Sequence, residues 1–247
     1  MKSHGINSWL FLFTLYMKRF ALFLILIFMT AGLLSAQQIQ NDPYFAVSTH
    51  PITVMSIGSY PDSLVLVLSI ENQLANGYFC VNRKVYAENL KTKNRTYMLS
   101  ERGLPYCPEV YHFKWKGEQK IFYLVFPSLG KDVRYVNVVE DCKDQCFELF
   151  GLVLDPKMNA EINRAYDAYK IGNTSEALNL FEHVIQTYPD YPYGTFVDHV
   201  IKILLEQGQY KEAGKWYKKL QFSSFLDKKP LLIQVRSYEG FDRIPQN

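Results

Sequence analysis

The stretch YKIGNTSEALNLFEHVI, at residues 169–185, has a second copy 36 residues further along the chain, LEQGQYKEAGKWYKKLQ at residues 205–221. Apolar residues recur at helical spacing in both copies, and a fixed period of this length is typical of stacked supersecondary units. The repeat therefore predicts that this part of the chain folds as two similar helical units. The matched pairs are Gly172 and Gly208, Glu176 and Glu212, Ala177 and Ala213, and Phe181 and Tyr217.

Each copy is predicted to form a tight turn followed by an amphipathic helix. Glycine accepts the backbone conformation that the turn needs, and Ala one turn into the helix lets another helix approach closely. Phe181 and Tyr217 are expected to fill the groove between paired helices. Asn173 and Glu176 have the spacing of a capping box, and Pro189 ends the helix before the loop YPDYPYG. The quoted stretch thus contains the second helix of a hairpin.

These hairpins resemble the tetratricopeptide repeat over residues 158–220, because that family repeats a helix, a tight turn and a second helix every ~34 residues. The turn and second helix of the second copy match best, through Gly208, Tyr210, Ala213 and Tyr217. The first helices depart from the family, which favours Trp, Leu, Gly and Tyr there. They carry Glu161, Arg164, Ala165 and Ala168 in the first copy, and Val197, Val200, Ile201 and Leu204 in the second. Plain helical hairpins that cover the rest of the protein are the alternative.

The resemblance implies that the first helices line a concave face. Carried over to this chain, the family positions on that face are Asn159, Asn163, Tyr166, Tyr169, Thr195, Asp198, His199 and Lys202. A strip of polar and aromatic side chains suits an extended peptide or a partner helix. The alternative is that Tyr166 and Tyr169 pack against the other half of the protein. The family's clamp for C-terminal carboxylates is not recognisable.

The preceding half, residues 37–156, has the pattern of short strands bounded by Gly, Pro, Asn and Asp. With no helical segment between them, these strands predict an antiparallel, Ig-like β-sandwich in front of the tetratricopeptide-like hairpins at residues 157–222. The fold class is thus mixed, with two domains. The candidate strands are ITVMSI (52–57), SLVLVLSI (63–70), YFCVNRKVYA (78–87), RTYML (95–99), HFKWK (112–116), KIFYLVF (120–126), RYVNVV (134–139) and FELFGLVL (147–154).

The strand patterns also indicate positions within the sheets. Residues 63–70 and 120–126 are apolar on both faces and are expected to form central strands. HFKWK alternates between apolar and polar residues, so one face of this strand is expected to be exposed to solvent. Residues 122–155 resemble an accessory β-domain of secreted and envelope proteins of Bacteroidota-type bacteria. That resemblance implies an exported bacterial protein and no particular reaction.

Two repeats are fewer than the three that a stack usually needs to be stable alone. The helices are therefore expected to lean on the sandwich or on the C-terminal tail, residues 223–247. The tail contains LLIQV, and its periodicity fits either a capping helix or a strand.

The N-terminal 36 residues predict a secretory signal peptide. Its positive residues, Lys18 and Arg19, precede an apolar run of 14 residues, and Ser35 and Ala36 offer a cleavage site. We expect translation to start at Met17; an uncleaved signal anchor is the alternative. Removing residues 1–36 takes the count of Lys and Arg from 27 to 24, equal to the 24 Asp and Glu. Overall charge then gives no argument for nucleic acid binding.

The four cysteines, Cys80, Cys107, Cys142 and Cys146, all lie in the strand-rich half. An even number in an exported chain predicts disulfides. Of the three possible connectivities we favour Cys80 with Cys107 and Cys142 with Cys146, because a short bridge can close the loop EDCKDQCF. The first bridge would contribute ~3 kcal/mol by restricting the unfolded chain. Zinc or redox sites normally show closer, repeated Cys-x-x-Cys spacing.

No catalytic motif stands out, and the sequence predicts a non-enzyme without cofactor or metal. The leading hypothesis is an exported scaffold or adaptor in the periplasm or cell envelope, which binds a protein or peptide partner. The alternative is a glycan- or lipid-binding sandwich that is rich in Tyr and contains Trp115. A basic helix face could meet an acidic partner or, peripherally, an anionic membrane surface, but a solvated helix face is the favoured explanation. It consists of Lys211, Lys215, Lys218 and Lys219.

Overall fold

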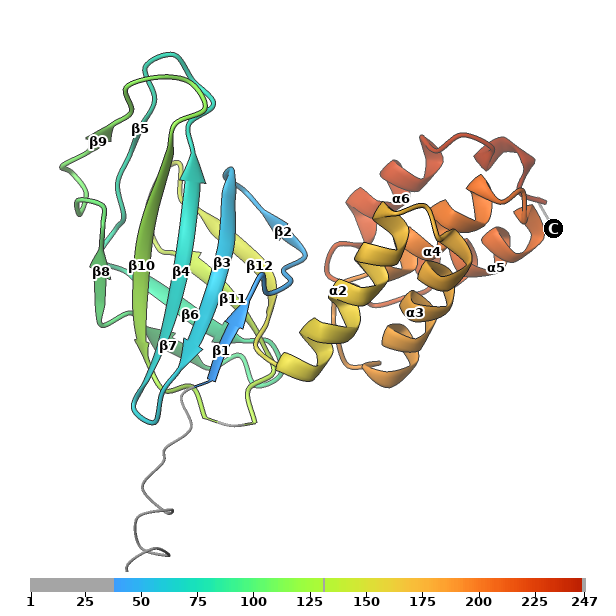
Figure 1. Ribbon diagram of the computed structural model, residues 1–247, viewed down its shortest axis with the longest axis horizontal. Helices are drawn as coiled ribbons and strands as arrows, with labels where there is room; N and C mark the ends of the chain where they lie inside the picture. The colour runs from blue at the N-terminus through green and yellow to red at the C-terminus, as the bar shows by residue number, and fades with distance from the viewer. Residues whose placement is uncertain (1–37, 131, 246–247) are drawn as a thin grey trace, which may run out of the picture. The chain divides into compact units, whose positions relative to one another are not determined.

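The computed structural model of the protein describes residues 38–130 and 132–245, so the predicted signal peptide at residues 1–36 lies outside the described residues. In the described part, antiparallel sheets come first and helices follow, as predicted (Figure 1). None of the helices described is long and apolar enough to span a membrane.

Two five-stranded sheets and one short strand pair make up the β domain. The first sheet has the order β1 (Gln38–Asn41), β3 (Ile52–Ser59), β4 (Ser63–Glu71), β10 (Gln119–Pro127) and β8 (Ser100–Arg102). The second has the order β2 (Val47–Ser48), β12 (Glu148–Val153), β11 (Tyr135–Glu140), β6 (Val85–Asn89) and β7 (Arg95–Tyr97). The short pair is β5 (Tyr78–Phe79) with β9 (Tyr111–His112). Neighbouring strands run antiparallel from β3 to β8 and throughout the second sheet.

The two large sheets bury one common core. Alternate residues of β4 and β10, such as Leu66, Leu68 and Phe122, are fully buried and belong to the same apolar cluster as Leu149 and Leu152 of β12. Alternation with a period of two brings one side of each strand to that core. β4 lies in the middle of its sheet with β10 beside it, so the central placement of both strands is confirmed.

The strand predicted at HFKWK is wrong beyond its first residue. Only His112 lies in β9; the chain then turns, and Gly117 has a φ of +90°. The side-chain amide of Asn72 donates to the carbonyl of Trp115 at 2.7 Å, and the Glu118 carboxylate accepts the backbone N–H of Lys114. These bonds hold the segment in a turn. The short edge strands β1, β2 and β8 are not evident in the sequence.

Both disulfides form with the favoured connectivity. Cys80 is bonded to Cys107 and Cys142 to Cys146, across 27 and 4 positions of sequence. Structural disulfides are typical of proteins that fold in an oxidising compartment.

After the strands, the described residues form five helices and a short 3₁₀ turn. They are α2 (Pro156–Lys170), α3 (Thr174–Thr187), α4 (Thr195–Glu206), α5 (Tyr210–Gln221), α6 (Lys228–Arg236) and η1 (Phe241–Arg243). Two helical hairpins are thus present where the repeat predicts them, and LLIQV is part of a helix, α6.

The two hairpin turns are built in the same way. Gly172 and Gly208 have φ values of +78° and +71°. At each turn the N–H of the residue after glycine donates to the carbonyl five residues earlier, Asn173 to Ala168 and Gln209 to Leu204, at 2.9 and 2.8 Å. This is the Schellman C-cap, which needs a left-handed residue and therefore favours glycine. The repeated residues after the turns are also buried alike: Ala177, Ala213, Phe181 and Tyr217.

The helices share their core with the β domain. Leu90, Tyr135 and Val153 of the β domain belong to the apolar cluster that the helices bury, and so do Leu231 and Val235 of α6. Strands and helices belong to one compact unit, Ile39–Asn247. The helical hairpins therefore pack against both the β domain and the C-terminal tail.

Candidate functional site

One stripe of side chains recurs on the first helix of each hairpin. Eight residues of α4 are buried, and the others follow at intervals of four, three and four: Thr195, His199, Lys202 and Glu206. Such intervals place side chains on one face of a helix. Thirty-six residues earlier, the same positions of α2 hold Asn159, Asn163, Tyr166 and Lys170. Equivalent faces of α2 and α4 therefore carry polar and aromatic residues.

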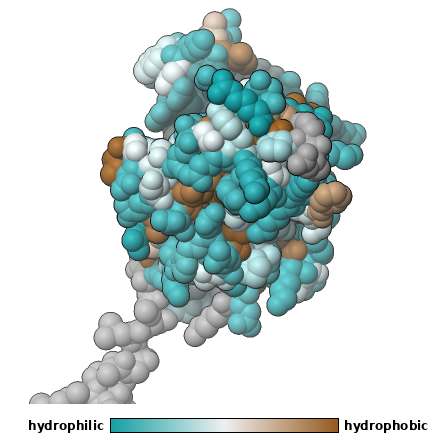
Figure 2. All heavy atoms as spheres, turned by 90° about the vertical axis from the view of Figure 1, so that its right-hand side faces the viewer, coloured by the Kyte–Doolittle hydropathy of each residue, from teal (hydrophilic) through white to brown (hydrophobic). Residues whose placement is uncertain are grey.

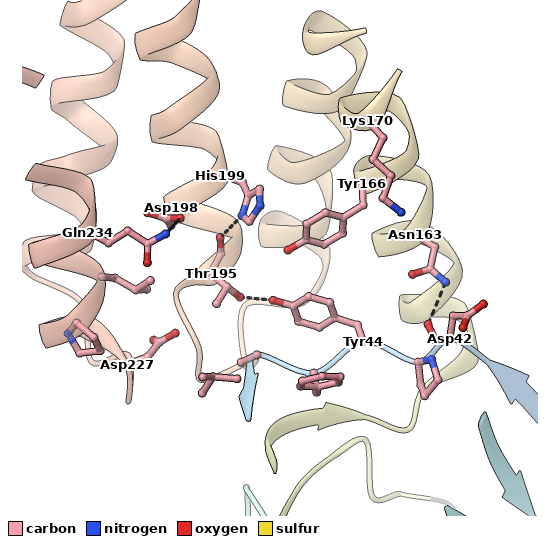
Figure 3. Close-up of a pocket in the computed structure, with 16 residues that line it drawn as sticks. Asp42, Tyr44, Asn163, Tyr166, Lys170, Thr195, Asp198, His199, Asp227 and Gln234 are labelled. Carbon is pink, nitrogen blue, oxygen red and sulfur yellow. Dashed lines mark hydrogen bonds between the residues drawn. The ribbon is translucent and has the colours of Figure 1, made fainter. Parts of the chain in front are cut away.

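A cavity of about 580 Å³ opens beside these stripes (Figure 3). One wall is α2, another is α4, and the third is α6 with the residue before it. The chain's own segment 42–47, which runs between β1 and β2, forms the remaining side. The helical lining residues are Asn163, Tyr166, Lys170, Thr195, Asp198, His199, Asp227, Pro230, Leu231 and Gln234. We call this space the α4 groove.

Tyr44 closes the lower end of the α4 groove. Its backbone N–H donates to the side-chain oxygen of Asn159 at 2.9 Å, and its hydroxyl bonds to that of Thr195 at 2.5 Å. Its ring stacks on Tyr166, with 5.7 Å between the ring centroids, and lies 4.9 Å from Phe196. Burial raises the pKa of Tyr44 far above its ordinary value, so this hydroxyl stays protonated. Tyr44 therefore lies between α2 and α4 and bonds to both helices.

Five of the eight predicted binding residues line the α4 groove: Asn163, Tyr166, Thr195, Asp198 and His199. Asn159 does not face it, because it is 4% exposed and its amide donates to Gln40 and to the carbonyl of Val153. Asn159 instead holds the β domain against α2.

Tyr169 and Lys202 lie further along the same face. The hydroxyl of Tyr169 donates to the Glu206 carboxylate at 2.8 Å, and the Lys202 ammonium lies 5.3 Å from the centre of the Tyr169 ring. A second cavity, of about 440 Å³, is lined by Lys202 and Glu206 together with Tyr238 and Arg243. The stripe on α4 therefore passes from one cavity to the next.

Asp198 is a buried carboxylate at a position where the first repeat has Ile162. It is 3% exposed. Its Oδ2 accepts a hydrogen bond from the Tyr238 hydroxyl at 2.8 Å and one from the Gln234 amide at 3.3 Å. Its Oδ1 is buried and has no hydrogen-bond partner among the described residues. Burial raises the pKa of Asp198, which the Tyr238 bond and the nearby charges of His199 and Lys202 partly oppose.

His199 and Asp227 are also partly withdrawn from water. The Nδ1–H of His199 donates to the carbonyl of Thr195 at 2.9 Å, and burial lowers the pKa of the imidazole. His199 is therefore neutral at pH 7. Oδ1 of Asp227 accepts the N–H of Gly194 at 2.8 Å, and burial raises the pKa of this carboxyl group.

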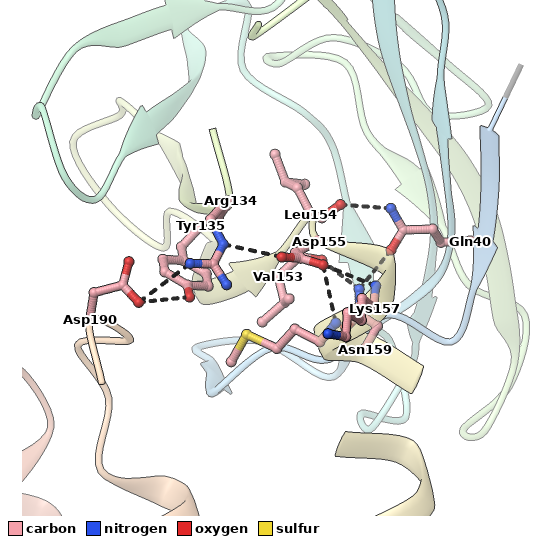
Figure 4. Close-up of polar contacts among 10 residues, drawn as sticks. Gln40, Arg134, Tyr135, Val153, Leu154, Asp155, Lys157, Asn159 and Asp190 are labelled. Atoms are coloured by element: carbon pink, nitrogen blue, oxygen red, sulfur yellow. Dashed lines mark hydrogen bonds and ion pairs between the residues drawn. The ribbon is translucent and has the colours of Figure 1, made fainter. Parts of the chain in front are cut away.

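A polar junction fixes α2, one wall of the groove, to the β domain (Figure 4). Asp155 caps α2, since its Oδ1 accepts the N–H groups of Lys157 and Met158 at 2.9 and 3.1 Å. Its Oδ2 accepts from Arg134 at 3.1 Å, and the same guanidinium lies 3.6 Å from Asp190. The N-terminal end of α2 is thereby fixed to the β domain and, through Asp190, to the α3–α4 loop.

Two other surfaces suggested by the sequence, around Trp115 and on α5, show fewer features of a binding site. Trp115, proposed for glycan binding, is 58% exposed in the turn after β9. On the basic face of α5, Lys215 pairs with Glu212 at 2.7 Å and Lys219 lies over the Trp216 ring. Figure 2 shows the side of the molecule that carries the helices as mostly hydrophilic, with scattered apolar residues. Among the described residues, no group of three His, Cys, Asp or Glu side chains is arranged to hold a metal ion.

No protein-family model matches the chain, and a comparison with curated proteins finds no match either.

Proposed function

We propose that the protein is a non-enzymatic, exported adaptor of the bacterial envelope, and that it holds an extended segment of a partner protein in the α4 groove. The single observation that carries this proposal is the groove itself, lined by five residues from the predicted concave face. Polar and aromatic side chains on two helices, with an open space of peptide size between them, suit main-chain and side-chain recognition of a peptide.

The dimensions of the groove fit a short peptide. The stripe on α4 begins in the groove at Thr195 and continues past it to Glu206 at the second cavity, a span of eleven rises or about 16 Å. An extended chain advances about 3.3 Å per residue, so the stripe accommodates roughly five residues. At the end of the groove, Tyr44 already bonds to α2 through its backbone N–H and to α4 through its side-chain hydroxyl.

In this proposal the helices are a short tetratricopeptide-like module, and the two packed sheets are an Ig-like sandwich that supports it. The identical glycine caps, 36 residues apart, support the repeat. The two disulfides support folding in an oxidising compartment. The tail helix α6 takes the place of a third repeat, because it covers the apolar side of α4 with Leu231 and Val235.

Site-directed photo-crosslinking in the native cells tests the adaptor proposal. The photoreactive residue p-benzoyl-phenylalanine replaces Asn163, which lines the groove, or Asn179, which is exposed on α3 outside it. We expect a discrete crosslinked partner from position 163 and none from position 179. Absence of any crosslink at 163, or the same products from both positions, would contradict a partner in the groove.

The proposed export is tested by measuring the intact mass of the protein purified from native envelopes. We expect a chain that begins at Gln37 and whose four thiols react with an alkylating reagent only after reduction. A retained N-terminus, or four free thiols, would contradict the proposed compartment.

A further inference from the structure

We propose that the α4 groove selects its partner by one basic side chain, lysine or arginine, whose charged group binds the Asp198 carboxylate. This inference rests on the proposed function, since it names the chemistry of the segment that the same groove holds. Three observations lead to it: the unpartnered oxygen of Asp198, the excess of acidic groups around the groove, and its aromatic walls.

The first observation is the incomplete hydrogen bonding of Asp198. A carboxylate withdrawn from water is destabilised unless donors satisfy its oxygens. Two other buried acids meet this need with a donor on each oxygen: Glu140 accepts the backbone N–H groups of Asn82 and Phe147, and Glu118 is bonded in the same two-sided way. Asp198 has donors on Oδ2 alone. An ammonium or guanidinium group supplies several N–H donors and a compensating charge at once.

The second observation is the sign of the charge around the groove. Three carboxylates, Asp42, Asp198 and Asp227, line it, against one lysine, Lys170. Lys170 is engaged with Asp167 on its own helix, at 3.6 Å. His199 contributes no charge at pH 7, because burial lowers its pKa. The groove therefore attracts a cation and repels an anionic segment.

The groups around Asp198 itself leave its charge unpaired. α4 presents His199 and Lys202, and the tail presents Gln234 and Tyr238. Lys202 forms no ion pair with Asp198 among the described contacts; its ammonium lies over the rings of Tyr169 and Tyr238, 5.3 and 6.0 Å from their centres. The charge of Lys202 thus acts on Asp198 from a distance, and no described ion pair has to be broken for a ligand cation to bind there.

The third observation is the aromatic lining. Tyr44, Tyr166 and His199 border the groove, and the last two rings meet edge to face, with 4.9 Å between their centroids. Aromatic faces attract cations and also cover the apolar stem of a Lys or Arg side chain. These rings lie on the α2 side of α4, whereas Asp198 points towards Gln234 of α6 (Figure 3), so they would cover the apolar stem of a basic side chain and not its charged group.

Gln234 lies between Asp198 and the exterior. Its amide donates to Oδ2 of Asp198 and to the Tyr238 hydroxyl at 2.8 Å, and the residue as a whole is exposed. Rotation of this exposed side chain requires no change in the core. The entering cation then replaces the amide as a donor to Oδ2 and reaches Oδ1 as well.

The test is selection of a phage-displayed library of random peptides on the purified full-length protein. We expect enriched peptides that share one lysine or arginine at a fixed position. A synthetic copy of an enriched peptide should bind Asp198→Asn at least tenfold more weakly than the native protein. The matched control, Asp132→Asn, changes an exposed aspartate in the loop between β10 and β11 and should bind normally. Thermal unfolding followed by circular dichroism checks that both variants fold.

Replacing the basic residue of the peptide by norleucine tests the same contact with the unaltered protein, and we expect at least a tenfold loss of affinity. Enriched peptides without a basic residue, or equal binding of norleucine peptide or Asp198→Asn, would overturn the inference and leave the adaptor proposal standing. Failure to enrich any peptide would overturn both.

Discussion

Gly151 is a point where the β domain and the α3–α4 loop pack closely. It lies in β12 with a φ of +69°, its carbonyl accepts the hydroxyl of Tyr191 at 2.7 Å, and its N–H donates to Asn137. The Tyr193 hydroxyl donates to the same oxygen of Asn137, at 2.9 Å. A side chain at position 151 would meet the Tyr191 hydroxyl and the Tyr193 ring at 2.5 and 2.7 Å. Glycine is therefore required here for two reasons, backbone conformation and space.

Two glycine substitutions separate these two effects. Gly172→Ala strains the backbone but meets no atom within 4 Å, so we expect a loss of about 1 kcal/mol in the free energy of unfolding. Gly151→Ala adds overpacking against buried tyrosines, and we expect a loss of about 2–4 kcal/mol. Urea unfolding measures both. Equal losses at the two positions would show that the close packing at Gly151 is not energetically important.

The burial of Asp198 predicts a pH-dependent effect of its replacement. Since burial raises its pKa above the ordinary value of 3.8, the folded protein binds this proton more tightly than the unfolded chain. The resulting stability is complete below pH 3.8 and is lost as the pH rises through the folded pKa. Asp198→Asn carries no charge, so it should unfold at a higher temperature than the native protein at pH 7.

The advantage of Asp198→Asn should shrink as the pH falls from 7 towards 4. The lowered pKa of His199 works in the other direction, because its contribution is lost as the pH falls below 6.5. Asp198 partly opposes this shift, so its removal should lower the His199 pKa further and shrink the advantage of Asp198→Asn at low pH in the same direction. The comparison uses the difference between the unfolding temperatures of the two proteins. A difference that is constant with pH, as expected for the exposed control Asp132→Asn, would contradict the raised pKa.

The helical hairpins were predictable because their signals are local. The turn glycines, the cap at Asn173 and the spacing of buried Ala177 and Phe181 all lie within one repeat, and the repeat occurs twice. HFKWK failed as a strand because its conformation is set from outside, by the amide of Asn72, 43 residues before the carbonyl of Trp115 that it binds. Alternation alone contains no information about such a distant bond.

The α4 groove was predictable only from its two repeat helices. Its other sides are the segment 42–47 and α6, which have no counterpart in the repeat. Tyr44 meets its partner Asn159 across 115 residues of sequence, and nothing near Tyr44 indicates that contact. Asp198 appeared in the sequence as one more polar residue. Its distinguishing property, an unpartnered buried oxygen, depends on packing among α4 and the tail.

The two disulfides close loops of very different length, and this difference predicts their relative contributions. In the chain-entropy estimate the stabilisation grows with the logarithm of loop length. Replacing Cys80 and Cys107 by Ser should therefore lower the free energy of unfolding by about 1.5 kcal/mol more than replacing Cys142 and Cys146, whose separations are 27 and 4 residues. Urea unfolding of the two double variants checks this order. A larger loss from the short loop would mean that the EDCKDQCF turn itself is required for folding.

The helices and the β domain depend on each other for a complete apolar core. Val153 and Tyr135 of the β domain pack in the same cluster as Met158 of α2 and Tyr191 of the α3–α4 loop, and all four are at most 5% exposed. Separating the halves would expose these residues to water, at a cost of about 25 cal/mol for each Å² of apolar surface.

A fragment that contains only residues 155–247 should therefore be markedly less helical and melt at lower temperature than the same helices in the full chain. Circular dichroism at 222 nm during heating measures this difference. Co-expression with residues 37–154 is the control, because it restores the missing core without a covalent connection and should recover the helical signal. If the isolated fragment melted at the same temperature as the full protein, the helices would be an independent module, and the contacts of Val153, Tyr135 and Gly151 would not stabilise the walls of the α4 groove.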